Sequence, residues 1–274
     1  MTQKFITIAG CKLAYLEKNS TVQNTIFFIH GNSLSSRSWK AQLISKELQD
    51  YRLIAIDLPA HGDSEASPDP AKDYSIPGLG AIIAAAVKAL TADRAYILVA
   101  LSLGTNIMAE SLAFGLHPAG IVLAGSCLIG EKHTLDSFVY PDTNVAVVFT
   151  EQAPQNEVRL YASQVMSNSD ALVVEEFVTD YYQVKLLFRS SLSGSIQEQK
   201  YNDQIALIHA VDKPALVIFG KDEQVINPDY LDDAPFKLWQ NTVFKIPSAS
   251  HLVQSDRPEE FNKLLADYVA AAFV

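Results

Sequence analysis

Cysteine is scarce in this 274-residue sequence, which contains only Cys11 and Cys127. The two residues lie in separate apolar segments and form no Cys-x-x-Cys pair, and no histidines are clustered. A disulfide framework, a structural zinc site and any other metal or cofactor are therefore not expected. Both cysteines are interpreted as small apolar core residues in a reducing compartment.

Long apolar runs and basic clusters are also missing. No run approaches the ~20 residues that span a bilayer, and residues 1–8 alternate in polarity, unlike a signal peptide. With 31 acidic against 21 basic residues, the formal net charge is −10. A nucleic-acid partner would need a basic patch and is not expected. We therefore predict a cytoplasmic protein without a membrane or nucleic-acid partner; nothing indicates an oligomeric state.

What is present is the pattern of a globular α/β protein, with 49% hydrophobic and 19% charged residues. Residues 5–8 and 12–16 flank Ala9-Gly10 and predict an antiparallel hairpin. Short apolar runs, typical of parallel strands buried on both faces, follow at 26–29, 53–56, 96–99, 121–124, 215–219 and 242–246. Helical spacing is found at 39–48, 77–90, 105–114 and 258–273. This alternation predicts a mostly parallel sheet with helices on both faces.

The segment from about 128 to 208 interrupts this rhythm. It is rich in aromatic residues, and 157–166 and 171–187 have helical spacing. We interpret residues 130–205 as a helical cap inserted into a core formed by 1–129 and 206–274. Ordinary crossover helices remain an alternative interpretation.

A serine lies between a strand-like and a helix-like segment. The apolar run at 96–99 continues into Ala100-Leu101-Ser102-Leu103-Gly104, after which helix-forming residues begin. Small residues two positions before and after Ser102 allow a strand and a helix to approach closely around an exposed hydroxyl. Taken alone, Ser102 is either a nucleophile at a tight turn or a helix N-cap.

Three further motifs occur in a fixed order: FFIHGN at 27–32, DLPAHGDS at 57–64, and SASH at 248–251 followed by DRPEEF at 256–261. With residues 100–104, they resemble the α/β-hydrolase superfamily over essentially the whole chain. HGNS at 30–33, DLPAHG at 57–62 and GKDE at 220–223 are most similar to capped serine esterases and lactonases of the N-acyl-homoserine lactone hydrolase type. The resemblance implies a mostly parallel eight-stranded sheet with a cap.

The resemblance also implies a catalytic set. Ser102 would be the nucleophile, and His251, in a loop after the last strand, its general base. The segment that follows strand 215–219 contains two candidates for the acid that orients the imidazole. The usual spacing from Gly220 favours Glu223, whereas the commoner residue type favours Asp222. Glu223 is preferred, and both remain open.

Further site residues follow from the chemistry of acyl transfer. A tetrahedral oxyanion needs two hydrogen-bond donors, for which the resemblance implies the backbone N–H groups of Asn32 and Leu103. Gly31 would allow the close approach of the backbone to the substrate. In the cap, Tyr161 is the substrate-binding candidate, because a phenol can bond a carbonyl while its ring packs.

The expected activity is hydrolysis of a carboxylic ester or lactone, with an N-acyl-homoserine lactone as one candidate substrate. The acidic chain and aromatic cap favour a small, neutral, largely apolar substrate. A general carboxylesterase, a C–C bond hydrolase of the same fold, and a slow-turnover ligand receptor remain alternatives. The serine argues against the dehalogenases and epoxide hydrolases of this fold, which use an aspartate nucleophile.

Overall fold

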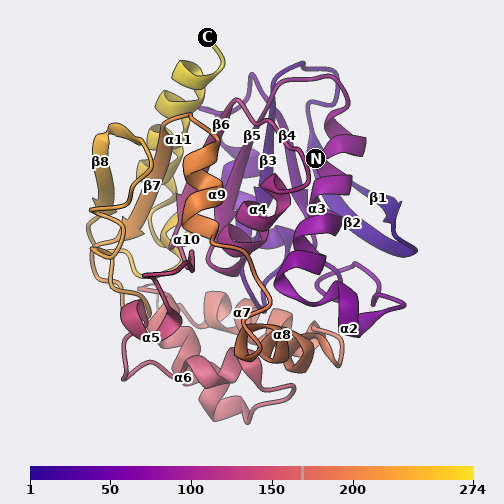
Figure 1. Ribbon diagram of the computed structural model, residues 1–274, viewed down its shortest axis with the longest axis vertical. Coiled ribbons are helices and arrows are strands. Elements are labelled where there is room, and N and C mark those ends of the chain that lie inside the picture. Colours follow the sequence, from indigo (N-terminus) through magenta and orange to yellow (C-terminus); the bar gives the residue numbers. More distant parts are fainter. Residues whose placement is uncertain (168–169) are drawn as a thin grey trace.

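The computed structural model describes residues 1–167 and 170–274. Their strands form one eight-stranded sheet of order β1-β2-β4-β3-β5-β6-β7-β8 (Figure 1). The strands are β1 (Thr2–Ile8), β2 (Cys11–Lys18), β3 (Thr25–Ile29), β4 (Arg52–Ile56), β5 (Tyr96–Leu101), β6 (Gly120–Ala124), β7 (Ala215–Gly220) and β8 (Leu238–Ile246). The hairpin β1–β2 joins the sheet antiparallel to β4, and β4, β3 and β5–β8 run parallel. The central strands are buried on both faces, as their apolar runs predict.

Helices cover both faces of the sheet, which confirms the predicted fold class. On one face pack α3 (Ile76–Thr91), α4 (Leu103–Leu112) and α9 (Gln204–Ala210); on the other pack α1 (Lys40–Ile44), α10 (Val253–Asp256) and α11 (Pro258–Ala272). The longest helix, α3, begins at an N-cap serine: the Ser75 side chain accepts a hydrogen bond from the Gly78 N–H. Pro77 occupies its first turn, where no N–H is needed.

The remaining helices gather at the carboxyl ends of the parallel strands, below the sheet in Figure 1. They are α2 (Pro70–Asp73), α5 (Leu135–Phe138), the 3₁₀ helix η2 (Val145–Phe149), α6 (Gln155–Val165), α7 (Ala171–Gln183) and α8 (Phe188–Gln197). All except α2 fall within residues 130–205. The division of the chain into a core and an inserted cap stays a prediction.

Two helical segments are shorter than their sequence patterns predict. Residues 39–48 contain the end of a 3₁₀ helix, η1 (Ser36–Trp39), and the short α1. The segment 171–187 does not form one helix, because the Lys185 N–H donates to the Ala60 carbonyl of the core, 2.9 Å away. Leu187 then adopts a left-handed conformation (φ 72°), and α8 starts at the next residue. A tertiary contact thus overrides the local pattern.

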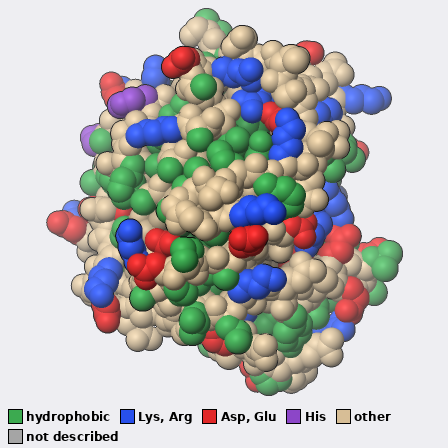
Figure 2. Space-filling view, turned by 90° about the vertical axis from the view of Figure 1, so that its right-hand side faces the viewer, with side chains coloured by type: hydrophobic (Ala, Val, Ile, Leu, Met, Phe, Trp, Pro, Cys, Tyr) green, Lys and Arg blue, Asp and Glu red, His purple; other side chains and the backbone are tan. Residues whose placement is uncertain are grey.

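The surface carries charges of both signs. In Figure 2, acidic and basic side chains are interspersed over the face shown, with apolar groups between them. No helix in the described part of the chain is long and apolar enough to cross a bilayer. The absence of a nucleic-acid partner stays a prediction.

Candidate active site

Ser102 occupies a strained turn between β5 and α4. Its φ of 52° and ψ of −125° are unusual for a residue with a side chain. The turn is this tight because α4 starts against the end of β3: a Cβ on Gly104 would lie 2.6 Å from the Ile29 carbonyl oxygen and 2.7 Å from that of His30. Only glycine fits there, and the turn projects the Ser102 hydroxyl above the sheet edge.

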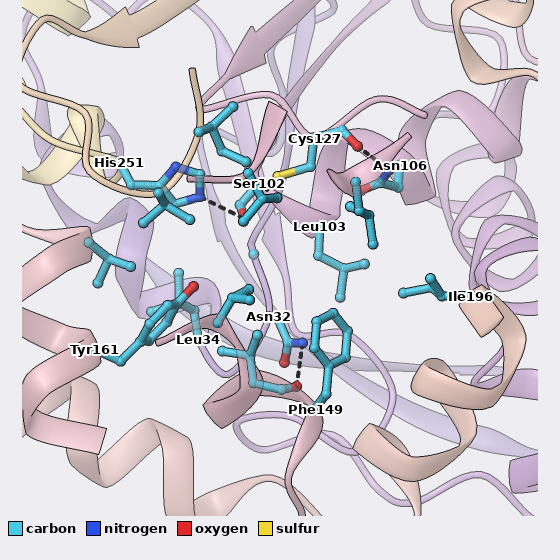
Figure 3. Close-up of a pocket in the computed structure, with 18 of the residues that line it drawn as sticks. Asn32, Leu34, Ser102, Leu103, Asn106, Cys127, Phe149, Tyr161, Ile196 and His251 are labelled. Atoms are coloured by element: carbon cyan, nitrogen blue, oxygen red, sulfur yellow. Dashed lines mark hydrogen bonds between the residues drawn. The ribbon is translucent and has the colours of Figure 1, made fainter. Parts of the chain in front are cut away.

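Residues from three distant parts of the sequence form a hydrogen-bonded chain at this edge, and Figure 3 shows its link between Ser102 and His251. The Ser102 Oγ lies 2.9 Å from His251 Nε2, and His251 Nδ1 lies 2.9 Å from Glu223 Oε2. Because a carboxylate only accepts, Nδ1–H of His251 donates to Glu223, which leaves Nε2 to accept the Ser102 hydroxyl proton. The structure therefore gives the imidazole the tautomer that a general base needs.

The structure separates the two acid candidates. The Glu223 side chain is fully buried, and its Oε1 accepts the N–H groups of Val225, at 2.9 Å, and Ile226, at 3.4 Å. The Asp222 side chain is exposed, and its backbone N–H bonds to the Ala249 carbonyl at 2.9 Å. Glu223 is thus held against the imidazole, whereas Asp222 faces solvent.

His251 is buried, and its protonation depends on its carboxylate neighbour. Burial, the largest single effect, lowers the pKa of His251, but the charge and hydrogen bond of Glu223 together with the interaction with Cys127 outweigh it. The net pKa lies above the ordinary imidazole value of 6.5. Glu223 therefore stabilises the imidazolium form, which is the form that follows proton abstraction from a serine.

Two buried histidines hold the loop after β3. His30 Nε2 accepts the Leu58 N–H at 3.0 Å, so its Nδ1–H donates to the Gly31 carbonyl at 2.7 Å. His61 Nε2 accepts the Ser33 N–H at 3.3 Å. Burial lowers the pKa of both imidazoles, which keeps them neutral and able to accept. The two histidines thus hold Gly31 and Ser33, the residues before and after Asn32.

The two backbone donors predicted for an oxyanion are both free. Among the described residues, neither the Asn32 N–H nor the Leu103 N–H has a hydrogen-bond acceptor. The Asn32 side chain is already used, because its Nδ2 donates to the Val148 carbonyl at 2.9 Å (Figure 3). Gly31 approaches the turn closely: a Cβ there would lie 3.1 Å from that of Ser102.

Ser102 opens into an apolar cavity of about 200 Å³ between the sheet edge and the helices below it. Among the described residues that line it, only His251 has a basic side chain and only Asp136 has a carboxylate. Most are aliphatic or aromatic, including Leu34, Ile129, Val148, Phe149, Val165, Phe177, Ile196, Val225 and Leu252. This lining suits a neutral ligand with a hydrocarbon part.

Tyr161 of α6 lies in the wall of this cavity. Its side chain is buried, and its hydroxyl has no hydrogen-bond partner among the described residues. Figure 3 shows the hydroxyl turned towards the end of the cavity that holds His251 and Ser102. Burial raises the pKa of Tyr161, so the phenol stays protonated and is able to donate.

Sequence reasoning missed two cavity residues. Cys127 was expected in the core, but its Sγ lies 3.6 Å from the Ser102 Oγ. It follows the end of β6, the strand beside β5, and that position was the available signal. Asn106 lies one helical turn after Ser102 on α4, and its amide donates to the Cys127 carbonyl at 2.6 Å. No cluster of potential metal ligands occurs in the described part of the chain.

Comparison with known proteins places the chain in a family. A curated relative, the uncharacterized hydrolase YugF of Bacillus subtilis (strain 168), is 22% identical over 96% of both chains. Epoxide hydrolase 1 of Caenorhabditis elegans is 23% identical over 97% of this chain and 70% of its own length. The solved structure of N-acyl homoserine lactonase AidH with N-hexanoyl homoserine lactone has a TM-score of 0.88 at 21% identity, covering 99% of this chain and 98% of that one.

The model of the alpha/beta hydrolase family matches residues 26–264, a range that contains every residue of the hydrogen-bonded chain described above. The match confirms the resemblance drawn from the motifs. The protein therefore belongs to the alpha/beta hydrolase family.

Proposed function

We propose that this protein is a serine hydrolase that cleaves a carboxylic ester or lactone through an acyl-enzyme intermediate. The observation that carries the proposal is the unbroken chain from Ser102 through His251 to Glu223, with 2.9 Å at each step. A serine hydroxyl becomes a strong nucleophile when an adjacent imidazole removes its proton. Glu223 holds the imidazole tautomer and stabilises the positive charge that forms on His251.

The remaining steps use groups already at the site. When the Ser102 Oγ attacks the carbonyl carbon, the negative charge moves to the carbonyl oxygen, which receives the N–H groups of Asn32 and Leu103. The imidazolium of His251 then protonates the departing alkoxide. In the second half, His251 activates a water that releases the acid from Ser102. Residues 130–205 act as the cap that closes the cavity over this chemistry.

For the substrate class, we propose a neutral lactone or ester with an apolar acyl chain, such as an N-acyl-homoserine lactone. The apolar cavity and its lack of basic side chains apart from His251 support a neutral substrate. The likeness to AidH, whose structure contains N-hexanoyl homoserine lactone, supports the lactone. Epoxide hydrolysis is less suited to this chain, because the turn between β5 and α4 presents a serine and no carboxylate.

A substrate panel tests this proposal. Initial rates should be measured for homoserine lactones with acyl chains of four to twelve carbons, for aryl esters of matched chain length, and for a styrene-type epoxide. We expect kcat/KM to be highest for a lactone or ester and no turnover of the epoxide. Stoichiometric binding of a lactone without steady-state turnover would instead support a receptor.

The proposed base implies a pH dependence. His251 must be neutral to act, so kcat/KM should rise with pH through its pKa. Because the Glu223 charge raises the pKa of His251, the Glu223→Gln variant, which loses that charge but keeps the burial and the contact with Cys127, should have its acid limb at lower pH. Profiles of kcat/KM from pH 5 to 11 for both proteins would check this, because the pKa of His251 is raised to about 10 in the wild type. An acid limb that stays in place, or moves to higher pH, would contradict the assignment.

The proposed role of Tyr161 gives a selective effect. Tyr161→Phe removes one hydroxyl that has no partner among the described residues, so it should leave the fold intact. We expect kcat/KM to fall by about tenfold for an acyl lactone, as for one lost hydrogen bond, and much less for a small aryl ester. Tyr182→Phe is the matched control. It also removes one tyrosine hydroxyl, but Tyr182 does not line the cavity and its hydroxyl bonds to the Ala153 carbonyl. Equal effects on both substrates would remove Tyr161 from the site.

A further inference from the structure

Arg189, in the first turn of α8, is almost completely buried, with 1% of its surface exposed. Among the described residues it forms no ion pair within 4.0 Å; its acceptors are neutral. Its Nη2 donates to Ser33 Oγ at 3.0 Å and to the Tyr181 carbonyl at 2.7 Å, and its Nη1 donates to the Glu151 carbonyl at 2.8 Å. Burial lowers the pKa of Arg189, and the nearby Glu151 charge offsets this only in part, so the cost of burying the cation must be met by its neutral acceptors.

The surrounding backbone is shaped to receive this guanidinium. The Tyr181 carbonyl is open because Lys185, four residues later, donates its N–H to the Ala60 carbonyl of the core. The helix break between α7 and α8 therefore frees the acceptor that Arg189 uses. The guanidinium also lies 3.8 Å above the Tyr181 ring, a favourable cation–π contact.

The other end of this contact is the loop that carries Asn32. Ser33 has a left-handed backbone (φ 60°) and is completely buried. Its Oγ accepts from two Arg189 nitrogens, Nη2 at 3.0 Å and Nε at 3.3 Å. Because arginine only donates, the Ser33 hydroxyl proton is directed to the Asn32 Oδ1, 3.0 Å away. A continuous path thus runs from Arg189 through Ser33 to Asn32.

The same asparagine has a second link to the helices below the sheet, through its Nδ2 and the Val148 carbonyl of η2. The Asn32 amide is therefore linked to residues 130–205 at both ends, directly through Nδ2 and indirectly through Oδ1, Ser33 and Arg189. Its backbone N–H, which has no acceptor among the described residues, is left free at the cavity.

We propose that Arg189 is a positioning residue that holds Ser33 and Asn32 so that the Asn32 N–H stays directed at the developing oxyanion. The inference rests on the proposed serine hydrolase function. The rate of hydrolysis then depends on how α8 packs against the loop after β3. Arg189 itself touches no reacting atom in this scheme, and the rate depends on it through the loop.

The primary test is Ser33→Ala, which removes the relay atom and leaves Arg189 its two carbonyls and the Tyr181 ring. We expect kcat for an aryl ester to fall about 10- to 100-fold, below the ~10²–10³-fold cost of deleting an oxyanion donor. KM should change by less than about twofold, since ground-state binding does not use this donor. Affinity for a trifluoromethyl ketone, whose adduct with the serine carries the oxyanion, should fall by the same factor as kcat.

A second variant and a double-mutant cycle distinguish a positioning role of Arg189 from a role in the stability of the fold alone. Arg189→Lys keeps the charge but loses the forked contact, and we expect a similar loss of kcat. Combining it with Ser33→Ala should cost no more than the larger single loss, because both act through one path. The control is Lys40→Met, which breaks the exposed Lys40–Glu176 ion pair between η1–α1 and α7. It should keep the wild-type kcat.

Two results would overturn the inference. One is wild-type kcat and inhibitor affinity in folded Ser33→Ala and Arg189→Lys proteins. The other is a lowered melting temperature with unchanged kcat, which would make Arg189 only an anchor for α8. Both differ from failure of the proposed function, in which Ser102→Ala would retain hydrolysis whatever the Arg189 variants do.

Discussion

The Ser102→Ala variant should lose ester and lactone hydrolysis by about 10⁴-fold or more, the usual cost of removing a nucleophile from such a set. The substitution removes one oxygen, which lies 2.9 Å from His251 Nε2. Alanine tolerates the strained backbone at this position about as well as serine, so the protein should remain folded. Rates should be measured on the best substrate of the panel, with folding checked by circular dichroism.

A matched control for this loss is Ser111→Ala on the same helix. Ser111 is also buried, but its Oγ donates to the Met108 carbonyl of α4 and does not line the cavity. We expect its kcat/KM to stay within about twofold of wild type. A fluorophosphonate, which reacts covalently with an activated serine, should modify the wild-type protein on the peptide that contains Ser102. Retention of most activity in folded Ser102→Ala would refute the serine mechanism.

Glu223→Gln should lower kcat by about 10³-fold or more, comparable with the ~10⁴-fold loss when the acid of a serine triad becomes an amide. The amide removes the charge that stabilises protonated His251. If its NH₂ group faces Nδ1, it also forces the imidazole into the tautomer that cannot accept the Ser102 proton. KM should change little, because the Glu223 side chain is fully buried behind His251.

The neighbouring carboxylate provides the control. Asp222→Asn makes the same chemical change one residue earlier, on an exposed side chain. We expect it to stay within a few-fold of wild type at saturating substrate. Glu223→Asp should recover part of the Glu223→Gln loss, because it restores the charge but shortens the reach by one methylene. A crippled Asp222→Asn with a mild Glu223→Gln would reverse the assignment of the acid.

Local patterns determined most of the fold. Buried parallel strands are recognisable because both of their faces are apolar, and the tight turn at Ser102 because only small residues let β5 and α4 approach. The family followed from motifs in order, and the family model confirms it. The helix expected over 171–187 was wrong in extent, since a bond from Lys185 to the core ended it.

Local sequence patterns did not predict the contacts between distant segments. Asp222 and Glu223 are adjacent in the chain, and only the packing of the turn after β7 decides which carboxylate meets His251. Cys127 was interpreted as an apolar core residue, and no local pattern singled out Arg189, yet one lies beside Ser102 and the other is bonded to the loop after β3. The sequence by itself thus determined the family and most of the helices and strands, because these depend on motifs and on neighbouring residues. Only the tertiary structure decided which side chains meet, because their positions depend on how distant segments pack.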